Sequence, residues 1–301
     1  MTLSGDEQCK PGPIGIAGAG RVAQALGRLL LDAGQPVVAM AGREPERTAR
    51  AAAVVGEGVI PASFDSLPAL ATRILIAVPD DALAEVADRL ARGGMAAGIA
   101  LHTSGARGAS VLEALERRGV SCGVLHPLQT FATPAQGAQA LPGSAFAVAG
   151  SGAAETWALE IVTLLGGNAL RIGPEQQPLY HAAAVMVSNY VVALVDAAVI
   201  LMEKAGVDRL EALRALAPLL TASAANAVAL TPAVALTGPI ERRDLRTVRA
   251  HLKALDQAPA TVSDLYRSAG RHTVDLARRK NPGADYSAVE HLLSKGAEAS
   301  E

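Results

Sequence analysis

Polar residues able to transfer protons follow two apolar segments in the middle of the chain. His102 ends the segment at 98–102 and Ser104 follows it, while His126 ends the segment at 122–126. An imidazole gains or loses its proton near neutral pH, so it can serve as a general acid or base. We therefore predict that His126 is the general acid or a substrate ligand, with Ser104 as its hydroxyl partner. A structural imidazole bonded to the backbone is an equally good interpretation of His126 and the favoured one for His102.

A glycine-rich turn near the start of the chain is typical of a nucleotide site. The segment 15–23 reads GIAGAGRVA, a G-x-G-x-x-A pattern between an apolar run and helix-spaced apolar residues. Gly18 permits the tight turn, Gly20 lets the backbone approach a pyrophosphate, and Ala23 lets the helix pack closely on the strand. The phosphates would then lie at the N-terminus of the helix, where free N–H groups favour an anion. The alternative is a strand–turn–helix corner whose glycines serve packing only.

The end of the next apolar segment, 35–41, indicates which dinucleotide binds. An NAD site usually has an acidic residue there, which holds the ribose 2′-OH. Here the segment is followed by Gly42 and Arg43, with Arg47 one helical turn later. A guanidinium suits a 2′-phosphate, so NADP is favoured over NAD, although nearby acids compete and Arg43 could instead cap the surface. The residues expected to contact NADP (NADPH) are Gly18, Ala19, Gly20, Arg21, Val22, Arg43, Val78, Pro79 and Asp80.

These residues are brought together if the first half of the chain forms a parallel sheet. Apolar runs alternate with helix-spaced segments, which implies parallel strands joined by right-handed crossovers. Ligands bind outside the carboxyl ends of such strands, where both histidines fall. Later runs at 144–149 and 169–172 are predicted to add strands at the sheet edge. The other predicted strands are 13–18, 35–41, 73–78, 98–102 and 122–126, and the helices between them are 21–33, 44–54, 81–91 and 109–118.

The chain changes character at about Gly173. Beyond it the apolar residues recur at helical spacing, so we predict domains at 12–173 and 174–301, the second all-helical. On a helix over about 175–205, His181, Ser188 and Asn189 share one face by i+3 and i+4 spacing. Asn189 could hold a substrate oxygen there. A buried polar network at a subunit contact is an equally good interpretation.

The composition restricts partners and location. A net charge of −2 gives no basic surface for nucleic acid. Cys9 and Cys122 match no metal or redox spacing, so we expect no metal and a cytoplasmic protein, and the polar segment 1–13 is expected to be a loose tail. The apolar segment 182–202 is long enough to span a bilayer, but Asp196 lies within it. We therefore favour a helix buried inside an oligomer over a membrane span.

With these residues assembled, the chain resembles a family of bacterial Rossmann-like proteins whose C-terminal part is a domain of unknown function. The family in turn is distantly similar to 6-phosphogluconate dehydrogenase, ketopantoate reductase, pyrroline-5-carboxylate reductase and prephenate dehydrogenase. The resemblance covers nearly the whole chain. It is carried by the segments 18–22 (GAGRV), 77–80 (AVPD), 102–105 (HTSG), 125–131 (LHPLQTF), 180–183 (YHAA), 188–189 (SN) and 236–239 (LTGP).

The resemblance implies an α/β fold with a Rossmann doubly wound parallel sheet, followed by a helical domain like the C-terminal domain of 6-phosphogluconate dehydrogenase. It also implies a homodimer formed through the helical domains. Prephenate dehydrogenases carry a functional histidine in a motif similar to His126-Pro127. The hydroxyacid dehydrogenases of this group place a catalytic lysine one turn before an asparagine. If Asn189 matches that asparagine, Val185 stands in place of the lysine, which puts their mechanism in doubt here.

The leading hypothesis is an NADP-dependent oxidoreductase that moves a hydride between the nicotinamide and a small keto or hydroxy acid. Ketopantoate-type reduction is one candidate, on family analogy alone. In this hypothesis His126 transfers or stabilises the proton, while Ser104 and Asn189 position the substrate. The alternatives are reduction of a cyclic imine, as by pyrroline-5-carboxylate reductase, and a non-catalytic NADP-binding sensor or interaction protein.

Overall fold

The structure is a computed structural model that describes residues 12–294. The chain divides into two compact units, residues 1–188 and residues 189–301. The boundary predicted at Gly173 marks the end of the strand-containing segment, whereas the first compact unit continues through one further helix to Ser188. Cys9 and the tail predicted before residue 12 lie outside the described residues.

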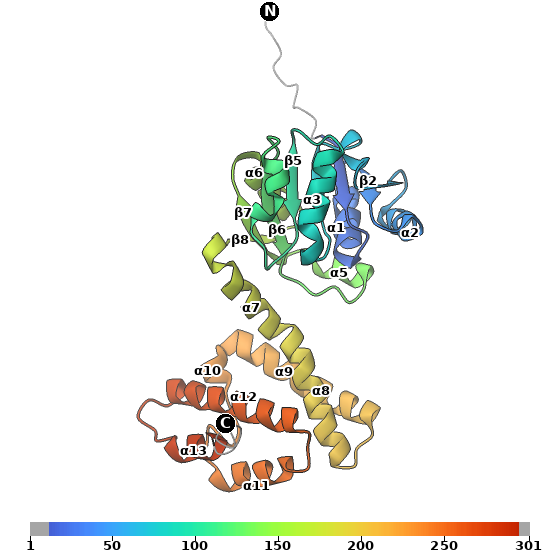
Figure 1. Ribbon diagram of the computed structural model, residues 1–301. Helices are drawn as coiled ribbons and strands as arrows, with labels where there is room; N and C mark the ends of the chain where they lie inside the picture. Colours follow the sequence, from blue (N-terminus) through green and yellow to red (C-terminus); the bar gives the residue numbers. More distant parts are fainter. Residues whose placement is uncertain (1–11, 295–301) are drawn as a thin grey trace, which may run out of the picture. The chain divides into compact units, whose positions relative to one another are not determined.

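The first unit is built on a mostly parallel sheet (Figure 1). Its strands lie in the order β3-β2-β1-β4-β5-β6-β7-β8. β7 runs antiparallel to β6, and the other neighbouring strands are parallel. This confirms the predicted Rossmann-like sheet and its two later strands. The strands are β1 (Ile14–Ala17), β2 (Val37–Ala41), β3 (Ile60–Ala62), β4 (Arg73–Ile76), β5 (Ile99–His102), β6 (Ser121–Pro127), β7 (Ala145–Gly150) and β8 (Asn168–Arg171).

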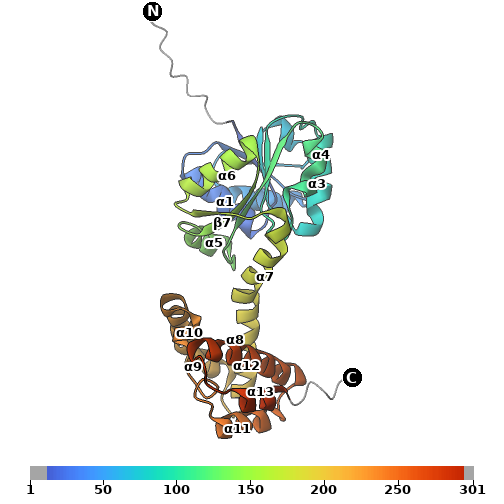
Figure 2. The same cartoon turned by 90° about the vertical axis from the view of Figure 1, so that its left-hand side faces the viewer.

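Helices cover both faces of this sheet, so its central strands are apolar on both sides. Ile14 and Ile16 of β1 join one buried cluster, and Ala17 joins the cluster on the opposite face. Successive side chains of a strand point to opposite faces, which explains this division. α1, α5 and α6 lie on one side of the sheet and α3 and α4 on the other (Figure 2). Each large apolar side chain that is fully buried, such as Ile14, stabilises the unit by about 1.5–3 kcal/mol.

The helices of the first unit follow the predicted segments closely where the apolar spacing is regular. Leu26 and Leu30 are fully buried along α1, and Gly34, at φ 76°, ends that helix as expected. The helices are α1 (Arg21–Asp32), α2 (Pro45–Val55), α3 (Leu83–Arg92), α4 (Glu113–Glu116), α5 (Pro134–Ala140), α6 (Gly152–Leu164) and α7 (Gln177–Val187). Short 3₁₀ helices lie at Leu67–Ala69, Asp80–Ala82, Ala109–Leu112 and Pro174–Gln176.

Four elements, all short or interrupted, differ from the sequence expectation. β3 was not predicted because it is too short to show a period, and α5 was not predicted although Thr133 and Pro134 mark its start. The helix predicted over 109–118 is a 3₁₀ turn followed by the single-turn α4. The long helix predicted over about 175–205 is interrupted at Ser188, where the backbone leaves the helical region, at φ −115° and ψ −80°.

The second unit is all-helical over its described residues, as predicted. It consists of α8 (Asn189–Lys204), α9 (Arg209–Leu230), α10 (Pro232–Ala235), α11 (Leu245–Leu255), α12 (Ala260–Lys280) and α13 (Ser287–Ser294). Its core is small and is formed by α11, α12, α13 and the turn that precedes α11. That turn, at 237–243, contains Arg243, whose guanidinium carbon lies 5.8 Å from the ring centre of Tyr286.

Two helical segments of the chain expose much apolar surface. Pro174–Lys204 and Arg209–Leu230 are long and apolar enough to cross a membrane by length and composition, with mean hydropathies of 2.1 and 1.4. Core helices of soluble proteins also pass this test, but these two are 6% and 0% buried within the chain over their most apolar stretch. On α9, Leu219 is 64% exposed and Val228 is 88% exposed. An exposed apolar surface of this extent is typical of a region that contacts another apolar surface.

Candidate functional site

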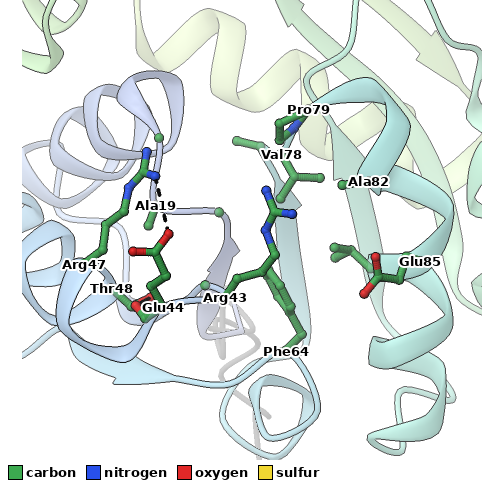
Figure 3. Close-up of a pocket in the computed structure, with 15 residues that line it drawn as sticks. Ala19, Arg43, Glu44, Arg47, Thr48, Phe64, Val78, Pro79, Ala82 and Glu85 are labelled. Atoms are coloured by element: carbon green, nitrogen blue, oxygen red, sulfur yellow. Dashed lines mark hydrogen bonds and ion pairs between the residues drawn. The ribbon is translucent and has the colours of Figure 1, made fainter.

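A pocket of about 210 Å³ opens at the carboxyl ends of β1, β2 and β4. It lies where the topology of a doubly wound sheet places a ligand. Figure 3 shows the side chains that line it, with the Arg43 guanidinium reaching into the open space. The lining residues are Gly18, Ala19, Gly20, Gly42, Arg43, Glu44, Arg47, Thr48, Phe64, Ala77, Val78, Pro79, Ala82, Glu85 and Val86.

The two glycines of the turn have different structural roles. Gly18 has φ 139°, and a side-chain carbon there would collide with the carbonyl oxygen of Ala77. A side-chain carbon on Gly20 would meet nothing within 4 Å, so the space beside its backbone is open to a ligand. Gly20 also precedes α1, whose first internal hydrogen bond runs from the N–H of Gln24 to the carbonyl of Gly20. The N–H groups of the first turn therefore have no partner within the helix and can bind an anion.

The arginine predicted to select the cofactor lines the same pocket. Arg43 is exposed and has no hydrogen bond or ion pair with another side chain among residues 12–294, so its donors are available to a ligand. Arg47 lines the same pocket and lies 4.0 Å from the Glu44 carboxylate, in an exposed and weak pair. Thr48 is buried and donates its hydroxyl to the Glu44 carbonyl at 2.7 Å, which fixes the start of α2.

Six of the nine residues predicted to contact the cofactor line this pocket, and the remaining three lie beside it. Arg21 begins α1 and donates a 3.2 Å hydrogen bond to the carbonyl of Phe131. Val22 packs against the hydrophobic core. Asp80 begins the 3₁₀ turn after β4, and its charge raises the pKa values of His102 and His126, although burial lowers both overall.

His102 has a structural role, as the sequence favoured. Its Nδ1 accepts a 3.2 Å bond from the N–H of Ser104, and its Nε2 lies 3.1 Å from the carbonyl of Gly108. These two bonds require the proton on Nε2. Burial lowers the pKa of His102 to about 4, so the ring is neutral at physiological pH. The imidazole thereby shapes the loop that follows β5.

Ser104 lies at the carboxyl end of β5, where its hydroxyl oxygen is already engaged. It accepts hydrogen bonds from the N–H groups of Ala106 and Arg107, at 3.2 and 3.1 Å, and the residue is 5% exposed. The side chain therefore caps a tight turn. Its predicted role in positioning substrate remains a prediction.

His126 lies near the end of β6 and contacts α7. Its Nδ1 is 2.7 Å from the hydroxyl of Tyr180, and the two rings meet edge to face. Burial and the neighbouring His181 lower the pKa of His126 to about 4, and burial raises the pKa of Tyr180 to about 12. Both groups are consequently neutral near pH 7. Asn189 begins α8 in the second unit, so its predicted role also remains a prediction.

Several site residues were not proposed from the sequence. Tyr180 and Gln177, on α7, contact residues more than 50 positions away, and no local pattern announces such contacts. Phe64 and Glu85 reach the nucleotide pocket from segments that carry no motif. His181 was noted on its helix face, but its approach to His126, at 6.1 Å between ring centres, was not foreseen.

Comparison with known proteins agrees with this arrangement. Residues 3–127 match a Rossmann-like domain, and residues 144–273 match a domain of unknown function, DUF2520. The chain joins a Rossmann-like domain to a DUF2520 domain. No curated protein matches the sequence.

Solved structures share the fold over nearly the whole chain. A candidate NADP oxidoreductase from Bacteroides fragilis is 24% identical, with a TM-score of 0.73, and the match covers 88% of this chain and 99% of that one. A protein from Thermotoga maritima is 21% identical, with a TM-score of 0.68 and coverages of 89% and 99%. A reductive aminase from Aspergillus terreus, in complex with NADPH and ethyl-5-oxohexanoate, is 20% identical, with a TM-score of 0.62 and coverages of 93% and 99%.

Proposed function

We propose that this Rossmann–DUF2520 protein is an NADP-dependent oxidoreductase acting on a small molecule. The observation that carries the proposal is the exposed guanidinium of Arg43, which reaches into the pocket formed by the Gly18–Gly20 turn (Figure 3). A bidentate guanidinium suits a phosphate monoester, which distinguishes NADP from NAD. Two proteins similar in fold support this choice: the Aspergillus reductive aminase was solved in complex with NADPH, and the Bacteroides protein is a candidate NADP oxidoreductase.

The residues present fit this cofactor at two points. The open side of Gly20 and the first-turn N–H groups of α1 would hold the pyrophosphate. Arg43 would hold the 2′-phosphate, and Arg47 lines the same pocket. Bound NADPH supplies the hydride, and the protein supplies binding, orientation and the proton. The proton then comes from the uncharged polar side chains at His126.

The substrate is a small molecule with a reducible carbon–heteroatom double bond. A keto acid, as in ketopantoate reduction, would need a cation to pair with its carboxylate. Over the described residues, the interactions of His126 and Tyr180 involve other aromatic or imidazole rings and the negative charge of Asp80. This neutral to negative setting favours an uncharged imine or ketone over a keto acid. The reductive aminase similar in fold supports the same choice.

Titration calorimetry with NADPH and NADH tests the cofactor. We expect NADPH to bind more tightly than NADH, and Arg43→Ala to weaken NADPH at least about tenfold, since a charge-assisted bond contributes about 1.5–3 kcal/mol. Arg50→Ala is the matched control, because Arg50 lies on α2, is exposed and does not line the pocket. If neither nucleotide binds the wild type, or if Arg50→Ala weakens NADPH as much as Arg43→Ala, the proposal fails.

The alternative of a non-catalytic NADP-binding protein is separated from an enzyme by reduction assays. We would supply NADPH with a cyclic imine, 2-methyl-1-pyrroline, and with ketopantoate. Turnover that is lost in His126→Gln while NADPH affinity is kept supports catalysis. Tight NADPH binding without oxidation of the nucleotide across a broad panel of imines and carbonyl compounds favours the sensor.

We also propose that the protein is a homodimer formed through its helical domain and resides in the cytoplasm. The apolar surface of α9, exposed within the chain, supports the dimer because a second copy of the same surface would cover it. Light scattering on protein purified without detergent tests this. A monomer under these conditions, or recovery only in detergent, would contradict it.

A further inference from the structure

Two imidazoles pack against Gly105, and one of them also contacts a tyrosine; none of these side chains lines the nucleotide pocket. The Tyr180 hydroxyl lies 2.7 Å from Nδ1 of His126, and the His126 and His181 rings meet edge to face at 6.1 Å. Tyr180 and His181 are consecutive on α7, and His126 comes from β6. The three side chains therefore belong to two elements of the same compact unit.

Gly105 brings the two imidazoles to one small space. A side-chain carbon on Gly105 would lie 2.7 Å from Nε2 of His126 and 2.7 Å from Nδ1 of His181. Both nitrogens therefore pack against Gly105, and because they lie at the same distance from one point they are close enough together for a single hydrogen-bonded oxygen to bridge them. Nδ1 of His181 is buried and has no hydrogen-bond partner among the described residues. A buried polar nitrogen without a partner is costly, which indicates that a water or ligand atom belongs there.

A second buried atom without a partner adjoins the same loop. Gln177 is 2% exposed, and its amide nitrogen donates to the carbonyl of Gly105 at 3.3 Å. Its Oε1 has no partner among the described residues. Two buried polar atoms, Oε1 of Gln177 and Nδ1 of His181, therefore lie near the loop at Gly105 without a hydrogen-bond partner among the described residues.

We propose that Tyr180, His126 and His181 form a proton relay, in which Tyr180 is the proton donor to the substrate and the two histidines resupply it. The relay rests on the proposed reductase function and names its substrate as an uncharged imine or ketone. In the reduction, the substrate carbon gains the hydride, the C=N or C=O π bond breaks, and the heteroatom takes the Tyr180 proton. The proton on Nδ1 of His126 then moves to the Tyr180 oxygen.

One proton from solvent keeps both histidines neutral and leaves their protons on Nε2, and exchange of these protons with solvent then restores the starting Nδ1–H forms. Nε2 of His126 takes a proton through the bridging oxygen from Nδ1 of His181, and Nε2 of His181 takes one from water. One hydride and one proton are thus consumed for each bond reduced, and no charge remains on the protein. Because both the phenol and the imidazole of His126 are neutral near pH 7, the relay can pass a proton without holding an ion in a buried place.

The charged and titratable groups around His126 agree with this substrate class. His181 and His102 lower its pKa, and Asp80 raises it. None of these groups is a permanent cation that would pair with a carboxylate on the substrate. Asp80 instead favours positive charge developing on a protonated imine nitrogen.

The chain offers a matched control in a second tyrosine–histidine pair. In the helical unit, Nδ1 of His251 lies 2.9 Å from the Tyr266 hydroxyl, with ring centres 6.0 Å apart. This pair has the same edge-to-face geometry but no glycine loop of the kind at Gly105. Tyr266→Phe therefore removes an equivalent hydrogen bond away from the nucleotide-binding unit.

The first test follows the imidazole nitrogens of ¹⁵N-labelled protein by NMR, without substrate. The chain has six histidines, so each signal can be assigned by substitution. We expect Tyr180→Phe to shift the Nδ1 signal of His126 and His181→Ala to shift its Nε2 signal. Tyr266→Phe should change His251 alone. His126 signals that are unchanged in both Tyr180→Phe and His181→Ala overturn the relay.

The second test measures reduction of 2-methyl-1-pyrroline and of ketopantoate with NADPH. We expect Tyr180→Phe to lower kcat at least about 100-fold, the effect of losing a general acid, with the Kd for NADPH unchanged. His181→Ala should lower kcat about tenfold and recover activity in imidazole buffer, which a purely structural role would not permit. Tyr266→Phe should keep the wild-type kcat.

The outcomes separate this proposal from the proposed function. Failure of the wild type to bind NADPH overturns the oxidoreductase. Normal NADPH binding and turnover with a wild-type kcat in Tyr180→Phe overturns the relay alone. Faster reduction of ketopantoate than of the imine overturns the assigned substrate class. If neither probe is reduced, the NMR comparison decides.

Discussion

Nδ1 of His102 accepts a hydrogen bond of 3.2 Å from the backbone N–H of Ser104, two residues further along the chain. With Nε2 bound to the Gly108 carbonyl, the neutral ring holds the loop after β5. Protonation would place a second hydrogen on Nδ1, facing the Ser104 N–H. The loop that carries Gly105 therefore depends on an uncharged imidazole.

This arrangement predicts acid sensitivity of the first unit. The pKa of His102 is about 4 when folded and near 6.5 when unfolded, so the unfolded chain binds the extra proton as the pH falls below about 6.5. Stability is therefore lost between about pH 6.5 and 4, by about 3 kcal/mol for this group alone. Urea unfolding followed by fluorescence of Trp157, the single tryptophan, measures this loss. His102→Asn should flatten the slope, whereas an exposed control, His272→Asn, should not. Equal slopes in both variants would refute this account.

The two glycines of the nucleotide turn should respond differently to alanine. Gly18→Ala meets the Ala77 carbonyl at a strained φ, so we expect a loss of about 3 kcal/mol or more in the free energy of unfolding. Gly20→Ala meets no atom, and we expect a change within about 0.5 kcal/mol but at least tenfold weaker NADPH binding. Denaturant unfolding and calorimetry measure both. Unchanged NADPH affinity in Gly20→Ala would mean that the phosphates lie elsewhere.

Thr231 is held in a backbone conformation that suits glycine. Its φ of 71° and ψ of 149°, between α9 and α10, are rare for a β-branched residue. Thr231→Gly relieves this strain but also gives the unfolded chain more conformational freedom. The net effect should be a helical unit more stable by about 1 kcal/mol. Far-UV circular dichroism during urea unfolding measures this, with Thr237→Gly as a control that should not stabilise. A less stable Thr231→Gly variant would show that this conformation carries no strain.

The exposed apolar surface of α9 should govern association. Leu219→Arg and Val228→Arg each place a charge on it, and we expect dimer affinity to fall at least about tenfold. Val54→Arg is the matched control, because Val54 is 52% exposed on α2 of the other unit. Sedimentation velocity over a concentration series gives the dissociation constants. Equal effects of Val54→Arg and Leu219→Arg would count against a specific interface.

Much of the fold was predictable because long periodic segments carry their own signal. The alternation of apolar runs and helical segments identified the strands of the parallel core, and the glycine turn with Arg43 identified the pocket that the structure contains. β3 escaped prediction because it has three residues, one of them Pro61, at the sheet edge. α5 did carry a local signal: Thr133 caps it and Pro134 begins it, a combination that marks a helix start.

The candidate site was less predictable, because its contacts are long-range. Nothing near His126 in the sequence announces Tyr180, which lies 54 positions away. Ser104 shows the opposite difficulty. A hydroxyl at a strand end suggests a catalytic or binding role. The hydroxyl oxygen of Ser104, however, already accepts hydrogen bonds from the backbone of its own turn, which only the three-dimensional structure shows.

Arg21 connects the two regions of the first unit for which we propose a function. Its guanidinium holds the carbonyl of Phe131, five residues after His126, while its backbone opens the helix that faces the proposed pyrophosphate site. A nucleotide that shifts Arg21 therefore also acts on the segment that follows His126. By thermodynamic reciprocity, a ligand at His126 must then change the affinity for the nucleotide by the same factor by which the nucleotide changes the affinity for that ligand. Such coupling would link the ligand affinities of the two sites through this one hydrogen bond.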